Sequence, residues 1–383
     1  MSKNIPLDPQ ASLLELRSLL TQTGHTQAQA FEKSRLVDYI AETDLPEIFA
    51  ACLSALLLTH DQAKEKGLLL QHECLSRLQW QAPELFYPHL AEMWRHRSPF
   101  WEGWWDAGKM GVDVILSNLE AIAGETPQTH RWYIQSALER CNCAEAFDWL
   151  HQNYGLTLLS NFAGVEYDGA GWRKLYYPAA YHFVFPPEYL EHPNWADHRR
   201  PTHPTWHLPA ECGEARLYDK FVPEKLEFEG TTFYRLELVE LPPEFQVTPP
   251  ISFQMPEDTA PNETCVDLQG NILQPDLDEA ETKDFYEELA ENPQMSNPFL
   301  GAEFIPIRFA RTPKRWYRQP DENEQNLSKL GGVGVWRQFE GEFAEGKCSG
   351  CGVFAPLLLQ LGDDGLRTPF CMSSFSGVKP AAV

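Results

Sequence analysis

Two cysteines in the C-terminal part of the chain have the clearest metal-ligand spacing. Cys348 and Cys351 flank a Ser-Gly pair, as in half of a zinc knuckle. A structural zinc site needs four such ligands, and the sequence has no second Cys-x-x-Cys pair. The residues that could supply the missing ligands are Cys212, Cys371, His203 and His207. Structural zinc and a redox role stay open, but we prefer packed thiols and expect no metal and no cofactor.

The familiar motifs of enzyme chemistry are missing from the sequence. It contains no Gly-x-Ser-x-Gly elbow, no Walker phosphate loop, no Gly-x-Gly-x-x-Gly dinucleotide turn and no His-Glu-x-x-His pair. Histidines and carboxylates are numerous, but no spacing singles out a catalytic pair. We therefore expect a protein that is not an enzyme and nominate no catalytic residue.

An aromatic run between residues 100 and 105 offers candidate partner-binding residues. Trp101, Trp104 and Trp105 follow the basic segment Trp94-Arg-His-Arg97. Exposed tryptophan and arginine are favoured anchors of protein interfaces. Large aromatic side chains are more often buried, so ordinary helix packing is the preferred interpretation of this run.

Negative charge is concentrated in one part of the chain. The formal net charge is -24, which disfavours direct binding to nucleic acid or to an anionic membrane. Residues 251–300 hold twelve acidic side chains and one basic one, and we expect a short acidic helix there. Its carboxylates, our first choice for contact with a basic partner, are Asp276, Asp278, Glu279, Glu281, Asp284, Glu287, Glu288 and Glu291. For the acidic stretch alone, a solvated surface insertion is preferred.

A basic cluster follows the acidic stretch directly. Its members are Arg308, Arg311, Lys314, Arg315 and Arg318. Such a cluster can bind phosphate. Because the acidic stretch lies shortly before it in the chain, we expect the cluster to pair with those carboxylates instead.

The segment 330–364 has the most specific pattern in the chain. It begins Leu-Gly-Gly-Val-Gly-Val-Trp-Arg-Gln, continues through the Cys-x-x-Cys pair, and reaches the apolar run 357–361 and two aspartates. Glycines at 331, 332 and 334 permit backbone angles that other residues avoid. The run 357–361 predicts a short buried strand.

This pattern resembles the YwqG-like family of bacterial domains. It is also similar to the C-terminal domain of programmed-cell-death-2-like proteins. The resemblance implies a β-rich fold of two similar halves and a protein-binding role. Because members of the family occur beside bacterial toxin genes, it further implies an immunity protein.

Length, cysteine content and the longest apolar run indicate the number of domains and the cellular compartment. With 383 residues the chain should form two or three domains, each able to bury a core. The nine cysteines are an odd number, and the first residues lack the apolar core of a secretory signal. The longest apolar run, 48–58, is far shorter than a membrane span of about 20 residues. We expect a cytoplasmic protein without a membrane anchor.

The first 155 residues predict a helical domain. Leucines recur at helical spacing, Pro46 suits the first turn of a helix that Thr43 or Asp44 caps, and Gly155 suits a helix end. A HEAT-like or ankyrin-like stack and an irregular bundle are both open. A break is expected between Gly124 and Pro127.

Residues 156–383 predict a β-rich domain with an acidic insertion around 245–300, so the fold class is α+β. Strands are expected at 181–185, 233–239 and 357–361. In a two-half fold, 233–239 would correspond to 357–361, and Trp206 to Trp336. Whether the two halves are a true repeat stays open.

Three functions are compatible with these patterns. The first is an immunity protein that binds and neutralises a bacterial toxin, most plausibly a basic nuclease delivered by an antibacterial system such as type VI secretion. Acidity, the family resemblance and the missing catalytic motifs favour it. The alternatives are a protein-binding scaffold or chaperone, and a zinc-dependent enzyme built on Cys348 and Cys351.

Overall fold

The computed structural model divides the chain into two compact units. Unit 1 comprises Met1–Arg173 together with Lys314–Gln319, and unit 2 comprises Lys174–Pro313 and Pro320–Val383. The structure describes residues 8–159, 162–175, 177, 179–184, 212–218, 233–245, 247–256, 264–266, 272–273, 304–316, 329–332, 357–361 and 370–374. Helices form the N-terminal region and an antiparallel sheet follows, so the protein is of the α+β class.

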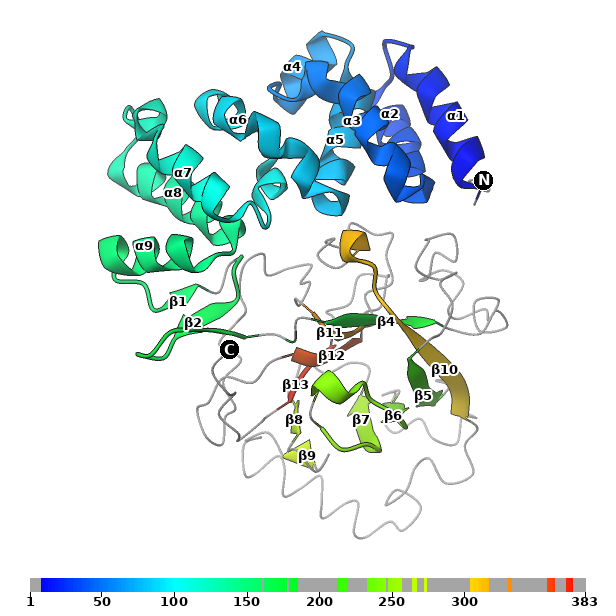
Figure 1. Cartoon of the computed structure of the whole chain (residues 1–383). Coiled ribbons are helices and arrows are strands. Elements are labelled where there is room, and N and C mark those ends of the chain that lie inside the picture. The colour runs from blue at the N-terminus through cyan, green and yellow to red at the C-terminus, as the bar shows by residue number, and fades with distance from the viewer. Residues whose placement is uncertain are drawn as a thin grey trace. The chain divides into compact units, whose positions relative to one another are not determined.

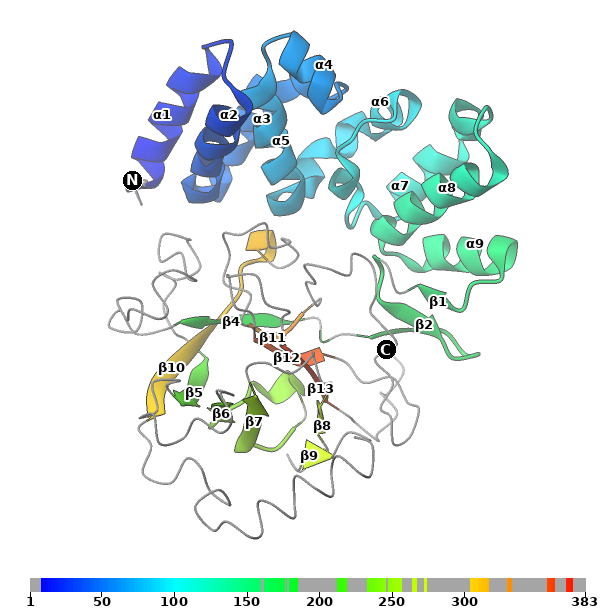
Figure 2. The ribbon, with the colours of Figure 1, turned by 180° about the vertical axis from the view of Figure 1, so that it is seen from behind.

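Unit 1 is a succession of short helices in chain order (Figures 1 and 2). The α-helices are α1 (Pro9–Leu20), α2 (Gln27–Ser34), α3 (Leu45–Cys52), α4 (His60–Glu65), α5 (Leu69–Gln81), α6 (Leu90–His96), α7 (Gly108–Leu116), α8 (Pro127–Cys141) and α9 (Ala144–Tyr154). The 3-10 helices between them are η1 (Arg35–Tyr39), η2 (Glu42–Asp44), η3 (Leu53–Ala55), η4 (Pro83–His89), η5 (Trp101–Trp104) and η6 (Leu119–Ile122).

Local sequence fixes many of these helix ends. Thr26 and Thr59 begin α2 and α4 with capping boxes, in which a glutamine three residues later bonds back to the cap. Pro46 lies in the first turn of α3, as predicted, and Asp44 is its N-cap residue, although its side chain makes no capping bond. Gly155 ends α9 with φ of 68°, which confirms the predicted helix stop.

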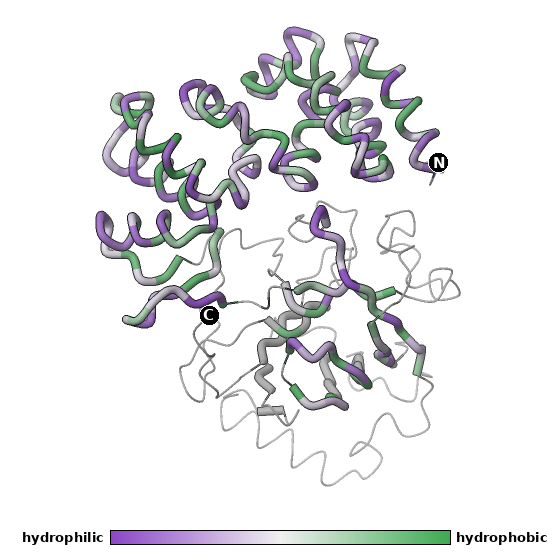
Figure 3. The backbone as a smooth tube through the Cα atoms, viewed as in Figure 1, coloured by the Kyte–Doolittle hydropathy of each residue, from purple (hydrophilic) through white to green (hydrophobic). Residues whose placement is uncertain are grey.

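A single hydrophobic core runs through unit 1 from Leu13 to Val165. The central helix α5 packs against α2 and α3, and further along the chain α7 packs against α8 and α9. Hydrophobic and hydrophilic residues are interspersed along the longer helices (Figure 3), as expected where one face is buried. Tertiary packing therefore stabilises helices that are too short to persist alone.

The compact part of unit 1 extends beyond its last helix. A small sheet of order β1-β2-β3 follows α9, formed by β1 (Leu158–Leu159), β2 (Val165–Tyr167) and β3 (Trp172–Lys174). Glu139 of α8 is fully buried, and its carboxylate accepts hydrogen bonds from Gln135 Nε2 at 2.7 Å and from the backbone N–H of Phe162 at 3.1 Å. This contact joins Phe162, between β1 and β2, to α8. Unit 1 therefore extends to Arg173, although its last α-helix ends near residue 155, where the domain boundary was predicted.

Unit 2 contains a ten-stranded sheet. Its strands are β4 (Ala180–Val184), β5 (Gly213–Tyr218), β6 (Phe233–Leu238), β7 (Ile251–Pro256), β8 (Thr264–Val266), β9 (Ile272–Leu273), β10 (Phe304–Arg311), β11 (Lys329–Gly331), β12 (Leu357–Leu361) and β13 (Phe370–Ser374). Their order is β7-β6-β5-β10-β4-β11-β12-β13-β8-β9. Neighbours pair antiparallel, except for β13 and β8, which are parallel.

The middle of this sheet is closely packed. Ala180, Tyr181, His182 and Phe183 of β4 are all buried, so side chains on both faces of the strand are covered. Phe309 of β10 packs so closely on β5 that a Cβ at Gly213 would lie 2.4 Å from its ring. Gly331 has φ of +63° and a Cβ there would lie 2.4 Å from the carbonyl oxygen of Ala179. Both glycines are therefore required by the sheet.

The strand order has an internal symmetry about the β10–β4 pair. The meander β5-β6-β7 continues outward from β10, and the meander β11-β12-β13 continues outward from β4. Corresponding strands begin at 180 and 304, 213 and 329, 233 and 357, and 251 and 370, so the offset stays between 116 and 124 residues. Each half thus consists of one central strand followed by a three-stranded meander, and the central strands lie beside the meander of the other half.

The structure confirms the three predicted strands as β4, β6 and β12. The sequence suggested that 233–239 and 357–361 occupy equivalent positions in two halves. In the sheet order, β6 and β12 are each the middle strand of a three-stranded meander. Residues 206 and 336 lie outside the described residues, as do Gly334 and the predicted acidic helix. Gly331 and Gly332 have the positive φ values that the sequence led us to expect.

Candidate functional site

The residues predicted to carry function fall into two groups. The acidic set, Asp276, Asp278, Glu279, Glu281, Asp284, Glu287, Glu288 and Glu291, lies outside the described residues, and so does the pair Cys348 and Cys351. For these residues the expectations stay predictions. The aromatic run of Trp101, Trp104 and Trp105 is described, and it is the starting point for the candidate site.

Two of these tryptophans are buried. Trp104 is 2% exposed and packs edge-on against Trp94, with ring centroids 5.8 Å apart. Trp105 is 6% exposed, and its carbonyl oxygen accepts a hydrogen bond from Tyr87 Oη at 2.5 Å. Both side chains are buried in this structure, in agreement with the preferred interpretation of the run as helix packing.

Trp101 differs because it lies at the margin of the core. Its ring stacks on Tyr133 of α8 at 5.4 Å and meets the edge of Trp132 at 5.6 Å. Trp132 is 52% exposed, which is unusual for an indole. Together with Arg97, whose guanidinium lies 5.9 Å from the Tyr133 ring centroid, these residues form what we call the α8 aromatic surface.

A buried ion pair between Arg140 and Glu102 lies next to Trp101. Arg140 of α8 donates to both carboxylate oxygens of Glu102, at 2.5 and 2.8 Å, and to the carbonyl oxygen of Ser136 at 3.1 Å. The same guanidinium lies 3.5 Å from the Phe162 ring centroid and 6.0 Å from that of Trp101. This bidentate geometry ties η5 to α8, so the rings of the surface are held on two rigid elements.

The charges around the α8 aromatic surface are largely compensated. Arg97 forms an ion pair with Glu125, and Arg131 lies over the ring of Tyr154 at 4.8 Å. Both arginines therefore already have a contact within unit 1. An exposed indole face can bind an apolar side chain or a cationic one from a partner.

Metal ligation, membrane spanning and thiol reactivity can also be judged from the described residues. Within the described ranges, no cluster of three or more His, Cys, Asp or Glu side chains is arranged to hold a metal ion. The described part of the chain also has no helix of the length and hydrophobicity needed to cross a bilayer. Burial raises the pKa of the Cys141 thiol well above its ordinary value, so that thiol is a poor nucleophile.

The basic cluster gave a result that the sequence did not predict. Arg315 is 8% exposed and bonds within unit 1, where it donates to Ile40 and Gln81. Its partners lie more than two hundred residues earlier, not in the acidic stretch. The expected pairing is therefore wrong for Arg315. Arg308 is half exposed and lies 3.9 Å from Glu214 on the neighbouring strand.

Sequence reasoning also missed Trp132 and Tyr133. Both lie in the region that was predicted to be helical, but nothing in the local pattern distinguishes an exposed tryptophan from a buried one. Comparison with protein-family models, with curated proteins and with solved structures finds no match to this chain.

Proposed function

We propose that this protein binds and neutralises a cognate bacterial toxin, as an immunity protein does. The α8 aromatic surface is the observation that carries the proposal, because its composition of tryptophan, tyrosine and arginine is that of interface anchors. The resemblance of residues 330–364 to YwqG-like domains supports the same reading. So does the net charge of -24, which suits a basic target such as a nuclease toxin of an antibacterial secretion system.

The proposal includes the finer architecture. We infer that unit 1 is a HEAT-like or ankyrin-like stack or an irregular helical bundle, and that unit 2 is a YwqG-like fold of two related halves. The nearly constant offset of 116 to 124 residues between corresponding strands supports the fold of two related halves. An immunity protein neutralises its toxin by binding it, so the proposed activity needs no catalytic group and no cofactor.

The test begins with the partner. Tagged protein is used to capture binding proteins from its own host at moderate salt, and mass spectrometry identifies what stays bound. We expect one abundant, stoichiometric, toxin-like protein. A spread of ribosomal or chaperone-related proteins would instead support a scaffold, and would count against the toxin.

A point variant then tests the surface. Trp132→Ala should weaken binding of the captured partner by about thirtyfold or more, because truncation of an anchoring tryptophan costs about 2 kcal/mol or more. The matched control is Leu14→Ala on α1, since Leu14 is 61% exposed and is far from Trp132 in the sequence. Isothermal calorimetry measures both. Equal affinities of the two variants and wild type would remove the α8 aromatic surface from the mechanism.

A further inference from the structure

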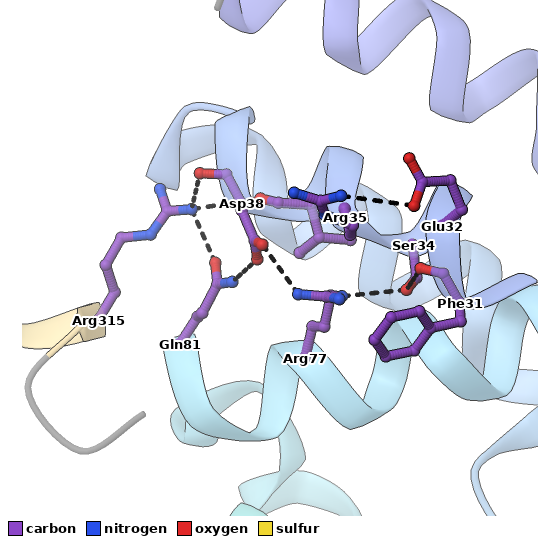
Figure 4. A network of polar contacts seen from close by, with 9 residues as sticks. Phe31, Glu32, Ser34, Arg35, Asp38, Arg77, Gln81 and Arg315 are labelled. Carbon is purple, nitrogen blue, oxygen red and sulfur yellow. Dashed lines mark hydrogen bonds and ion pairs between the residues drawn. The ribbon is translucent and has the colours of Figure 1, made fainter. Parts of the chain in front are cut away.

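The guanidinium of Arg315 occupies a site made by unit 1 residues (Figure 4). Nη1 donates to the carbonyl oxygen of Ile40 at 2.9 Å. Nη2 donates to the carbonyl oxygens of Val37 and Asp38, each at 3.3 Å, and to Gln81 Oε1 at 2.7 Å. Four acceptors thus converge on one planar group, which is 8% exposed. Arg315 belongs to η10 (Lys314–Trp316), directly after β10.

A second set of contacts orients these acceptors. Gln81 Nε2 donates to Asp38 Oδ1 at 2.6 Å, which turns the amide oxygen of Gln81 toward Arg315. The other oxygen of Asp38 accepts from Arg77 Nη1 at 2.8 Å, and Arg77 Nε donates to Ser34 Oγ at 3.0 Å (Figure 4). The network extends along η1 and α5, so the site is fixed by two packed elements.

Charge also favours a cation at this position. The Asp38 carboxylate is 5% exposed; desolvation raises its pKa, and Arg77 and Arg315 oppose that shift. The converging carbonyl oxygens lie at the C-terminal end of η1 and add partial negative charge. A lysine ammonium has three donors and no planar fork, so it cannot satisfy four acceptors arranged for a guanidinium.

We propose that Val37, Asp38, Ile40 and Gln81 form a guanidinium-binding socket, which Arg315 of the same chain fills. The ligand class is an arginine side chain, which the 3-10 helix η10 presents here. Because the chain leaves unit 1 after Arg173 and returns at Lys314, filling the socket joins a distant segment to the helices. The stability of η1 and α5 then depends on a residue that follows unit 2 strands in the sequence. This inference does not depend on toxin binding.

Three full-length variants test the socket. Arg315→Ala empties it, Arg315→Lys keeps the charge but not the fork, and Lys314→Ala is the matched control because Lys314 is an exposed neighbour on the same element. Amide hydrogen exchange is followed in 35–40 and 69–81. We expect exchange to accelerate at least about tenfold in Arg315→Ala, less in Arg315→Lys, and not in Lys314→Ala.

Chemical rescue tests the ligand class directly. Millimolar methylguanidinium should restore slow exchange and raise the Tm of Arg315→Ala, while wild type and Lys314→Ala stay unchanged. Methylammonium, a cation of the wrong donor geometry, should have little effect. If Arg315→Ala fails to fold, the same comparison is made on Arg315→Lys. Wild-type protection in both Arg315 variants, or equal rescue by the two cations, would overturn the socket.

Discussion

The buried imidazole of His72 makes the stability of the helical unit depend on pH. His72 lies in α5, with its ring 4.9 Å from Phe100 and 5.6 Å from His60. Desolvation, assisted by the nearby His60, lowers its pKa from the ordinary 6.5 to about 4, and the backbone of Leu58 partly opposes this shift. The folded protein therefore holds this ring neutral where the unfolded chain would protonate it.

The expected consequence is a loss of stability in mild acid. Between pH 6.5 and about 4 the unfolded state binds more protons at His72 than the folded state, so the free energy of unfolding falls as pH falls. His72→Leu should show a shallower decline over this range in urea unfolding. The exposed His96→Leu serves as the control and should follow wild type. Parallel curves for wild type and His72→Leu would show that His72 does not contribute.

Single residues also show where sequence reasoning stops. Gly331 could be predicted, because a glycine-rich turn requires φ angles that a local pattern reveals. Arg315 could not, since its acceptors come from η1 and α5, far away in the sequence. A run of basic residues gives no sign that one of them is buried. The exposure of Trp132 depends in the same way on how η5 packs on α8.

At the scale of elements, the contact between α7 and α8 depends on a helix position without a side chain. A Cβ at Gly111 of α7 would lie 2.6 Å from Cys141 Sγ on α8 and 2.9 Å from the Ala107 Cβ. Gly111→Ala should therefore destabilise the protein by about 1–2 kcal/mol, because overpacking exceeds the gain in helix propensity of up to about 1 kcal/mol. Thermal and urea unfolding measure the change.

A glycine in open space provides the control for this prediction. A Cβ at Gly124 would meet nothing within 4 Å, so Gly124→Ala should change stability by less than about 0.5 kcal/mol. Adding Cys141→Ala to Gly111→Ala should recover part of the loss, since the clashing sulfur is removed, and a double-mutant cycle measures that coupling. Equal stabilities of Gly111→Ala and Gly124→Ala would show that the helices separate without cost.

Elements were more predictable than their connections. Helices with Thr caps or a Gly stop, such as α9, and strands with buried apolar runs, such as β4, follow from local chemistry. Strand β10 was not predicted, because Pro306 and the arginines interrupt its apolar residues. Its place between β5 and β4 is set by pairing with strands on both sides, and such pairing is invisible in a local window.

At the scale of the whole molecule, the negative charge should affect how fast and how tightly a basic partner binds, and the effect depends on where the charge lies. The net charge of -24 should speed association with a basic partner, and added salt should slow it. Replacing Asp276, Asp278, Glu279, Glu281, Asp284, Glu287, Glu288 and Glu291 by their amides reduces the charge to -16. If this segment is the contact, we expect weaker binding of the captured partner and a smaller salt dependence of the association rate.

A variant of equal net charge separates contact from general attraction. Eight exposed carboxylates of unit 1 are amidated instead, again giving -16: Glu15, Glu42, Asp61, Glu65, Glu84, Glu92, Glu120 and Glu145. If the acidic segment is the contact, this variant should bind more nearly as wild type does, because charges outside the contact are screened over about 10 Å at 0.1 M salt. Calorimetry gives the affinities and stopped-flow mixing the rates. Equal weakening by both variants would assign the effect to total charge and remove the segment around 276–291 from the interface.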